Sequence, residues 1–210
     1  MLETIISSIG VFVSTSIDYL LILTILFGQS HVKNKRFHIY LGQYIGTGIL
    51  VLVSLLIAYA VNFLPKDWMI GLLGLIPIYL GIKFALLGEG DEDEKEDESK
   101  EVMEKLEASK SRKLFLTVAL LTIASGGDNL GVYIPFFASL DWVNILVSLI
   151  IFAIGIIGLC ELSSFISKIP FISETIEKYE RIIVPLVFIP LGIFIMYNNN
   201  VFKVLYSLFV

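Results

Sequence analysis

Three long stretches of the chain contain no charged residue, and they set the pattern of the whole sequence. They cover residues 37 to 65, 142 to 160 and 182 to 202. A helix that crosses the hydrocarbon core of a bilayer, roughly 30 Å thick, needs about 20 apolar residues. Each stretch therefore meets or nearly meets that length, and the sequence predicts a membrane protein.

Three further apolar stretches each contain one charged residue. They are residues 4 to 27 with Asp18, 68 to 87 with Lys83, and 115 to 139 with Asp128. Together with the uncharged stretches they predict six transmembrane helices in an all-α polytopic membrane protein. The tail from Val201 to Val210 either extends the last helix or lies along the membrane interface.

The composition narrows the function classes. The chain is 56% hydrophobic and 17% charged with a mean hydropathy of +0.85, which is outside the range of soluble globular proteins. Eleven acidic and six basic residues lie between Glu89 and Lys113, so little charge is left for a water-facing domain. The single cysteine excludes a disulfide framework. The net charge of -5 does not indicate the basic surface that binds nucleic acid. An enzyme is disfavoured, because the sequence lacks a Ser/His/Asp set, a histidine metal pair and a phosphate-binding loop.

The distribution of lysine and arginine predicts the orientation, because basic residues are retained on the cytoplasmic side. Loops 29 to 38, 88 to 114 and 167 to 181 hold twelve basic residues, whereas the opposite face has Lys66 and Lys203. We therefore expect both termini to lie outside the cytoplasm.

The two halves of the chain repeat one order of features. Each half has an acid within a small polar cluster, an uncharged stretch, a proline, and then an Ile-Pro pair followed by glycine. These are Asp18, Pro65, Ile76, Pro77 and Gly81 in the first half, and Asp128, Pro170, Ile189, Pro190 and Gly192 in the second.

Each half has three predicted spans. Because three is an odd number, the second half must enter the membrane from the face opposite to that of the first. We therefore expect two inverted three-helix repeats, residues 1 to 87 and 115 to 210, joined by an acidic cytoplasmic linker at residues 88 to 114. Many secondary transporters follow this plan, with the site near the midplane. A chance similarity of two hydrophobic stretches is the alternative.

Asp18 and Asp128 lie about as far into their own spans, roughly 20 Å from the entry face at about 1.5 Å per residue. Opposite insertion then brings both carboxylates to the middle of the membrane. A charged group at that depth indicates a functional site unless neighbouring hydroxyls or a lysine satisfy it. Lys83 lies near the cytoplasmic end of its span, so no basic residue is available to pair with them.

Oxygen-bearing side chains surround both acids and indicate a metal site. Candidate ligands besides Asp18 and Asp128 are Ser14, Thr15, Ser125 and Asn129. The hydroxyls three or four residues before each acid share its helix face. Gly126 and Gly127 weaken the helix there and free backbone carbonyls. The alternative is that the small residues only allow close helix packing.

Three motifs resemble the cadmium resistance transporter family, within the LysE superfamily of exporters. They are Tyr40 to Gly46 (YLGQYIG), Gly71 to Lys83 (GLLGLIPIYLGIK) and Ser125 to Tyr133 (SGGDNLGVY), and the resemblance covers essentially the whole chain. It implies efflux of Cd²⁺, with Zn²⁺ as a second candidate, across a bacterial cytoplasmic membrane. In this resemblance Asp18 and Asp128 match the paired intramembrane acids of the superfamily. Many relatives have a polar or acidic residue directly after the first Asp, where this chain has Tyr19.

Two acids suggest proton antiport. Ionised carboxylates bind one divalent cation, and protonation on the other side of the membrane releases it. A soft cation also prefers sulfur, and the only thiol, Cys160, stands beside Glu161 in the fifth span. This pair is a candidate entry station, although a buried cysteine is commonly a small core residue and Glu161 is equally compatible with an interfacial carboxylate.

The expected partners are therefore a divalent metal ion, protons and the lipid bilayer, with no resident cofactor. The oligomeric state stays open, a homo-oligomer included. Two rival functions remain: export of a basic amino acid or other organic cation, which would use the same acids, and a non-transporting membrane sensor or assembly protein.

Overall fold

The computed structural model describes residues 1–29, 34–61, 67–87, 114–168 and 173–209. Helices joined by turns make up these residues, and none of them forms a strand. The helices are α1 (Leu2–Gln29), α2 (Lys35–Val61), α3 (Asp67–Leu72), α4 (Leu75–Leu87), α6 (Leu114–Ser125), α7 (Leu130–Ala138), α8 (Trp142–Ile166), α9 (Ser173–Asn198) and α10 (Val201–Phe209). The all-α prediction is confirmed for the described residues. The predicted acidic linker at 88 to 114 lies outside them, apart from Leu114.

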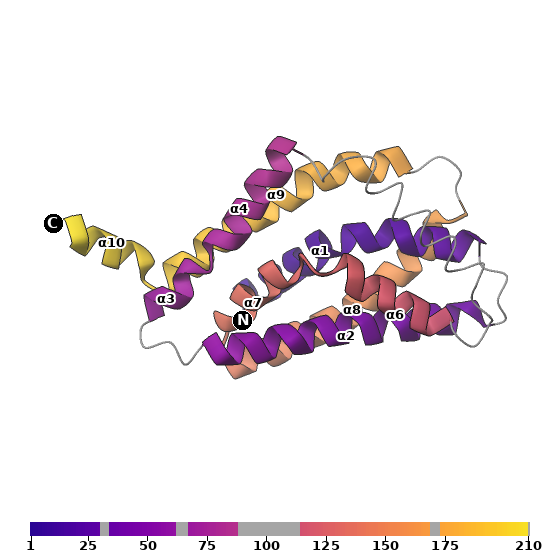
Figure 1. Ribbon diagram of the computed structural model, residues 1–210, viewed down its shortest axis with the longest axis horizontal. Coiled ribbons are helices and arrows are strands. Elements are labelled where there is room, and N and C mark those ends of the chain that lie inside the picture. Colours follow the sequence, from indigo (N-terminus) through magenta and orange to yellow (C-terminus); the bar gives the residue numbers. More distant parts are fainter. Residues whose placement is uncertain (30–33, 62–66, 88–113, 169–172, 210) are drawn as a thin grey trace.

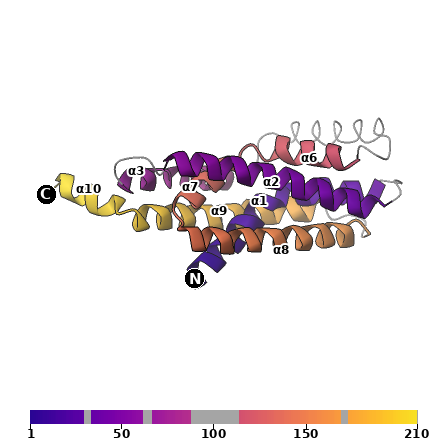
Figure 2. The same ribbon diagram turned by 90° about the horizontal axis from the view of Figure 1, so that it is seen from below.

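The helices run mainly along the long axis of the molecule (Figure 2). Among the described residues, α2 and α8 are long and apolar enough to cross a membrane by length and composition. The number rises to four if two bent helix pairs each form one span. The segments Trp68–Lys83 and Ile182–Asn198 are shorter apolar helices. Six spans therefore remain a prediction.

The two bends lie at the segments that contain the predicted acids. Helix α1 bends by 61° between Leu2–Ile17 and Ile22–Gly28, and α6 and α7 meet at 77°. The second bend follows from the sequence, because Gly126 and Gly127 come directly after the last residue of α6 and glycine disfavours a helix interior. Residues 115 to 139 thus form a broken helix.

The helices associate in pairs that are distant in sequence. Helix α1 packs on α8, α2 packs on α6, and α4 runs alongside α9 (Figure 1), while α10 extends beyond the other helices. Glycines allow the first two contacts. A Cβ on Gly46 would lie 2.5 Å from Thr122 Cβ, and a Cβ on Gly155 would lie 2.6 Å from the Phe12 ring. Such small residues let helix backbones approach closely in membranes.

Glycines also shape the contact of α3 and α4 with α9. A Cβ on Gly74 would lie 2.5 Å from the carbonyl oxygen of Gly192. A Cβ on Gly192 would lie 2.5 Å from Ile78 Cγ1, and one on Gly81 would lie 2.8 Å from Ile189 Cγ1. Side chains larger than hydrogen at these positions would push the helices apart.

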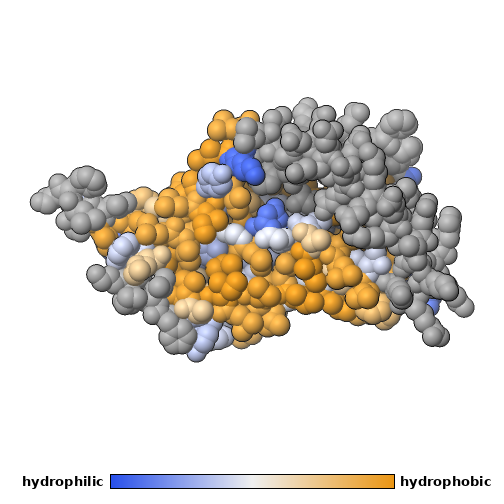
Figure 3. Space-filling model, in the orientation of Figure 1, coloured by the Kyte–Doolittle hydropathy of each residue, from blue (hydrophilic) through white to orange (hydrophobic). Residues whose placement is uncertain are grey.

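Apolar side chains cover most of the outer surface of the described residues. Leu56, Ile150 and Leu186 are each more than 60% exposed. Figure 3 shows this apolar face, with a polar patch near its centre. An apolar face of this kind suits contact with lipid.

Candidate functional site

The turn between α6 and α7 packs directly against α1 and α2. A Cβ on Gly126 would overlap the Tyr19 hydroxyl and the Leu50 side chain. Asp128 lies in this turn, and its Oδ1 accepts a hydrogen bond from the backbone N–H of Asn129 at 2.9 Å. The glycine therefore permits the turn that contains Asp128 to touch α1.

The Asn129 side chain joins this turn to α1. Its Nδ2 donates to the Tyr19 hydroxyl at 2.8 Å and to the Thr15 carbonyl oxygen at 3.1 Å. Because a carbonyl oxygen only accepts hydrogen bonds, the amide nitrogen must be the atom that faces α1. Asn129 and Tyr19 are both only 3% exposed. The residues that directly follow Asp18 and Asp128 are thus in contact with each other.

A second hydrogen bond continues the contact one helical turn further along. Thr15 Oγ1 and the Tyr133 hydroxyl lie 2.9 Å apart, and both side chains are buried. Thr15 and Tyr19 are four residues apart on α1, as are Asn129 and Tyr133 on the segment leading into α7, so each pair shares one helix face. Two matched faces hold α1 and α7 together around the predicted site.

The predicted ligands of the two acids occupy different environments. Ser14 and Thr15 are buried and donate to their own helix, to Gly10 O at 2.5 Å and Val11 O at 2.8 Å. Ser125 is partly exposed and Asp128 is exposed. The Asp18 side chain is outside the part that the structure describes, so its distance to Asp128 stays untested.

A buried polar cluster surrounds Gln43 of the YLGQYIG motif. The Thr122 hydroxyl donates to Gln43 Oε1 at 2.8 Å, and Gln43 Nε2 donates to Thr47 Oγ1 at 3.3 Å. All three side chains are buried. A Cβ on the neighbouring Gly42 would lie 2.5 Å from the Phe115 carbonyl oxygen, which lets α2 and α6 meet closely enough for these bonds.

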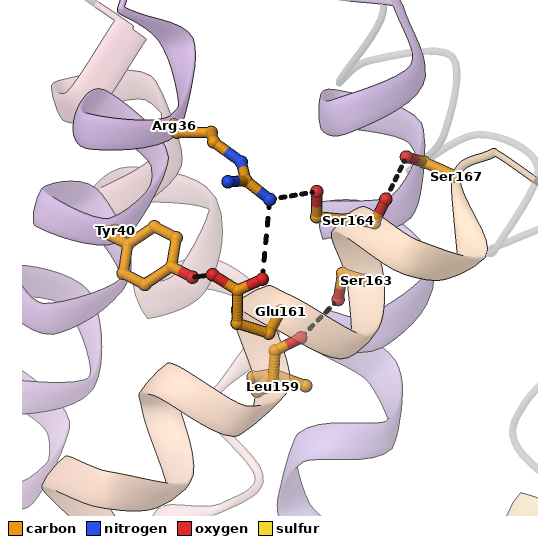
Figure 4. Close-up of polar contacts among 7 residues, drawn as sticks. All are labelled: Arg36, Tyr40, Leu159, Glu161, Ser163, Ser164 and Ser167. Carbon is orange, nitrogen blue, oxygen red and sulfur yellow. Dashed lines mark hydrogen bonds and ion pairs between the residues drawn. The ribbon is translucent and has the colours of Figure 1, made fainter.

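Cys160 and Glu161 point to different sides of α8. Cys160 is fully buried in the hydrophobic core, whereas the Glu161 side chain is 57% exposed. Glu161 Oε1 instead accepts from the Tyr40 hydroxyl at 2.6 Å, and its Oε2 accepts from Arg36 Nη2 at 3.4 Å (Figure 4). The predicted thiol and carboxylate thus lie in different environments, and their joint role in metal capture stays a prediction. In the part of the chain that the structure describes, no group of three or more His, Cys, Asp and Glu side chains could hold a metal ion.

Sequence reasoning missed the roles of Tyr19, Tyr133 and Arg36. Each of them contacts a residue more than 100 positions away, so no local sequence pattern indicated the contact. The available signal was position: Tyr19 directly follows Asp18, as Asn129 directly follows Asp128.

Comparison with known proteins supplies a family. A family model described as cadmium resistance transporter matches residues 12–208, nearly the whole chain and every candidate site residue. No curated protein and no protein of solved structure gives a match. The resemblance to the cadmium resistance transporter family is thereby confirmed. The apolar helices and this match together show that the chain is a membrane protein and belongs to the cadmium resistance transporter family, whose name implies a metal ion as the transported substrate.

Proposed function

We propose that the protein exports Cd²⁺, with Zn²⁺ as a second substrate, from a bacterial cytoplasm by binding one ion between Asp18 and Asp128. One observation carries the proposal: the hydrogen bond of 2.8 Å between Asn129 Nδ2 and the Tyr19 hydroxyl. These two residues directly follow the two acids, so the bond joins the segment of α1 that contains Asp18 to the turn that contains Asp128. Membership of the family supplies the class of substrate.

Reciprocal contacts between the halves support an inverted repeat. Gly81 packs on Ile189, and Gly192 packs on Ile78. The separation along the chain from Gly81 to Gly192 equals the separation from Ile78 to Ile189. Exchanging the two halves therefore turns each contact into the other, as a two-fold relation requires.

The other helix pairs follow nearly the same offset. Phe12 packs on Gly155, and Thr122 packs on Gly46. Phe12 and Thr122 occupy equivalent positions, because each precedes the acid of its own half by the same distance along the chain, and the two glycines are offset from each other by almost the same separation. The α1–α8 and α2–α6 pairs are thus equivalent in this scheme, which supports repeats at residues 1 to 87 and 115 to 210 with the acidic linker between them.

The two bends fit an ion site at the repeat interface. In transporters with inverted repeats, broken helices turn backbone groups toward the bound ion. Asn129 uses Nδ2 for its contacts with α1, so we assign its Oδ1 as a ligand beside the two carboxylates. The hydroxyl oxygens of Ser14, Thr15 and Ser125 complete the set, because a hydroxyl that donates a hydrogen bond keeps lone pairs for a cation.

Exposure of Asp128 supports access to the site. An ionised carboxylate at mid-membrane depth is costly unless water, a cation or another protein group reaches it. Asp128 is therefore proposed to face a water-filled route rather than lipid.

Charge balance favours proton antiport. Two ionised carboxylates cancel the charge of one divalent cation, and two protons replace that ion when the site faces outward. In the proposed topology both termini are outside, and loops 29 to 38, 88 to 114 and 167 to 181 face the cytoplasm.

The test is Cd²⁺ flux in proteoliposomes with an imposed pH gradient. Asp18→Asn and Asp128→Asn should each abolish flux while the protein stays folded. Asp141→Asn is the matched control, because Asp141 is an exposed acid that caps α8 and asparagine can also cap.

Four outcomes would count against the proposal. Cd²⁺ flux that ignores the pH gradient would exclude antiport. Wild-type flux in Asp128→Asn would exclude the site. Flux of lysine or arginine but not of Cd²⁺ would favour the organic-cation exporter, and absence of any substrate-dependent flux would favour a sensor or assembly protein.

A further inference from the structure

A polar cluster joins α2 and α8 at one end of the molecule and takes no part in the site between the two acids. It consists of Arg36 and Tyr40 on α2 and of Glu161 and Ser164 on α8 (Figure 4). Arg36 Nη2 donates both to Glu161 Oε2 at 3.4 Å and to Ser164 Oγ at 3.1 Å. The Tyr40 hydroxyl donates to the other carboxylate oxygen of Glu161 at 2.6 Å.

The position of Arg36 Nη2 is one that a cation could occupy. This positively charged group is held by a carboxylate oxygen and a hydroxyl oxygen. When Arg36 leaves, Glu161 Oε2 and Ser164 Oγ present oxygen atoms at that place, and the Tyr40 hydroxyl holds the other oxygen of the same carboxylate. Carboxylate, hydroxyl and water oxygens are sufficient to hold a divalent cation at a transient station. Cys160 is fully buried in the core and is not part of the proposed set of oxygen ligands.

The Arg36–Glu161 pair is exchangeable. The two side chains are 59% and 57% exposed, so water and salt screen their attraction and the pair adds little to stability. A divalent ion has twice the charge of arginine and interacts more strongly with the same carboxylate. An arriving ion can therefore replace Arg36.

The cluster lies where an exported ion would enter. Arg36 is in the first turn of α2, and Glu161 is near the end of α8. The loops next to these helix ends are the lysine- and arginine-rich ones that we place in the cytoplasm.

We propose that Glu161, Tyr40 and Ser164 form an outer capture site for a divalent cation, in which Arg36 is the resident counter-ion that the cation displaces. This inference rests on the proposed function, since it assumes that the ion continues to Asp18 and Asp128. Displacement of Arg36 breaks its bonds between α2 and α8, while the hydrogen bond of 2.6 Å from the Tyr40 hydroxyl to Glu161 still joins the two helices.

The test compares Glu161→Gln with Arg36→Gln in Cd²⁺ flux measurements on reconstituted full-length protein. Glu161→Gln should raise the Cd²⁺ concentration at half-maximal flux, and Arg36→Gln should lower it, each by about two- to fivefold, the range of an exposed charge pair. The maximal rate should stay near that of the wild type in both. If the pair had only a structural role, the two substitutions would change the half-maximal Cd²⁺ concentration in the same direction.

Two further variants keep the test specific. Lys168→Gln removes a positive charge near the same end of α8 and should leave the half-maximal concentration unchanged, because Lys168 is exposed and outside the cluster. Tyr40→Phe should raise the half-maximal Cd²⁺ concentration. This variant replaces Glu161→Gln if Glu161→Gln fails to insert or fold. An equal shift in Lys168→Gln and Arg36→Gln would overturn the capture site in favour of a general surface-charge effect.

The outcomes separate this inference from the proposed function. If Asp128→Asn transports Cd²⁺ like the wild type, the central site is wrong whatever Glu161 does. If Asp128→Asn is inactive, but Glu161→Gln and Arg36→Gln change the Cd²⁺ concentration at half-maximal flux in the same direction or not at all, the capture site alone is wrong.

Discussion

Replacing Gly126 by alanine tests the contact between α1 and the α6–α7 turn. The added Cβ would overlap the Tyr19 hydroxyl and the Leu50 side chain, and it would lie 2.7 Å from the carbonyl oxygen of Thr122. The last of these atoms belongs to the backbone and cannot rotate away. The neighbouring Gly127 is a matched control, because the nearest atom to its Cβ would be Ala124 O at 3.7 Å, an ordinary contact.

The expected magnitude follows from the crowding. Overpacking a well-packed interior costs about 1–3 kcal/mol, so Gly126→Ala should lower the free energy of unfolding by that amount. Gly127→Ala should change it by less than about 0.5 kcal/mol, as surface substitutions usually do. The Gly126→Ala protein relieves the overlap by moving the turn away from Tyr19 of α1 and Leu50 of α2, which weakens the contact between Tyr19 and Asn129.

Two assays follow this change. Unfolding in mixed micelles with increasing denaturing detergent gives the stability difference, and Cd²⁺ flux in proteoliposomes gives the functional one. Gly126→Ala should lose flux, whereas Gly127→Ala should transport like the wild type. Adding Tyr19→Phe to Gly126→Ala should restore part of the stability, because it removes one of the overlapping atoms. Equal behaviour of the two alanine variants would refute the reasoning.

Two other predictions concern helix packing. Gly192→Ala should lower the free energy of unfolding by about 1–3 kcal/mol, because its Cβ would overlap the Gly74 carbonyl oxygen; Gly158→Ala, with open space around it, should be close to neutral in the same detergent titration. Thr122→Val should cost about 1–2 kcal/mol, because it leaves the buried Gln43 Oε1 without its 2.8 Å donor. A titration in which Gly158→Ala is as damaging as Gly192→Ala, or Thr122→Val is neutral, would contradict these contacts.

The sequence predicted best where a long segment has one chemical character. The uncharged stretches 37 to 65 and 142 to 160 correspond to α2 and α8, because an uninterrupted apolar run of that length favours a single helix in lipid. The break after Ser125 was also foreseeable from two consecutive glycines. The predicted span at 68 to 87 is divided into α3 and α4 near Gly74, where the backbone lies against Gly192 of α9.

The side-chain contacts were less predictable, because they depend on how helices rotate and pair. Adjacent positions suggested one site for Cys160 and Glu161, yet neighbouring residues on an α-helix are about 100° apart, and one is buried while the other is exposed. The Tyr19–Asn129 and Tyr40–Glu161 bonds join residues 110 and 121 positions apart. Only the packed helices bring such groups together.

Counting the Cd²⁺ ions bound to purified protein tests most directly whether both acids hold one ion. The measurement is best made by titration calorimetry in the Glu161→Gln background, which removes the proposed capture site. We predict that this protein binds one ion and that adding either Asp18→Asn or Asp128→Asn removes it. An ion retained with unchanged affinity in either double variant would contradict a shared site.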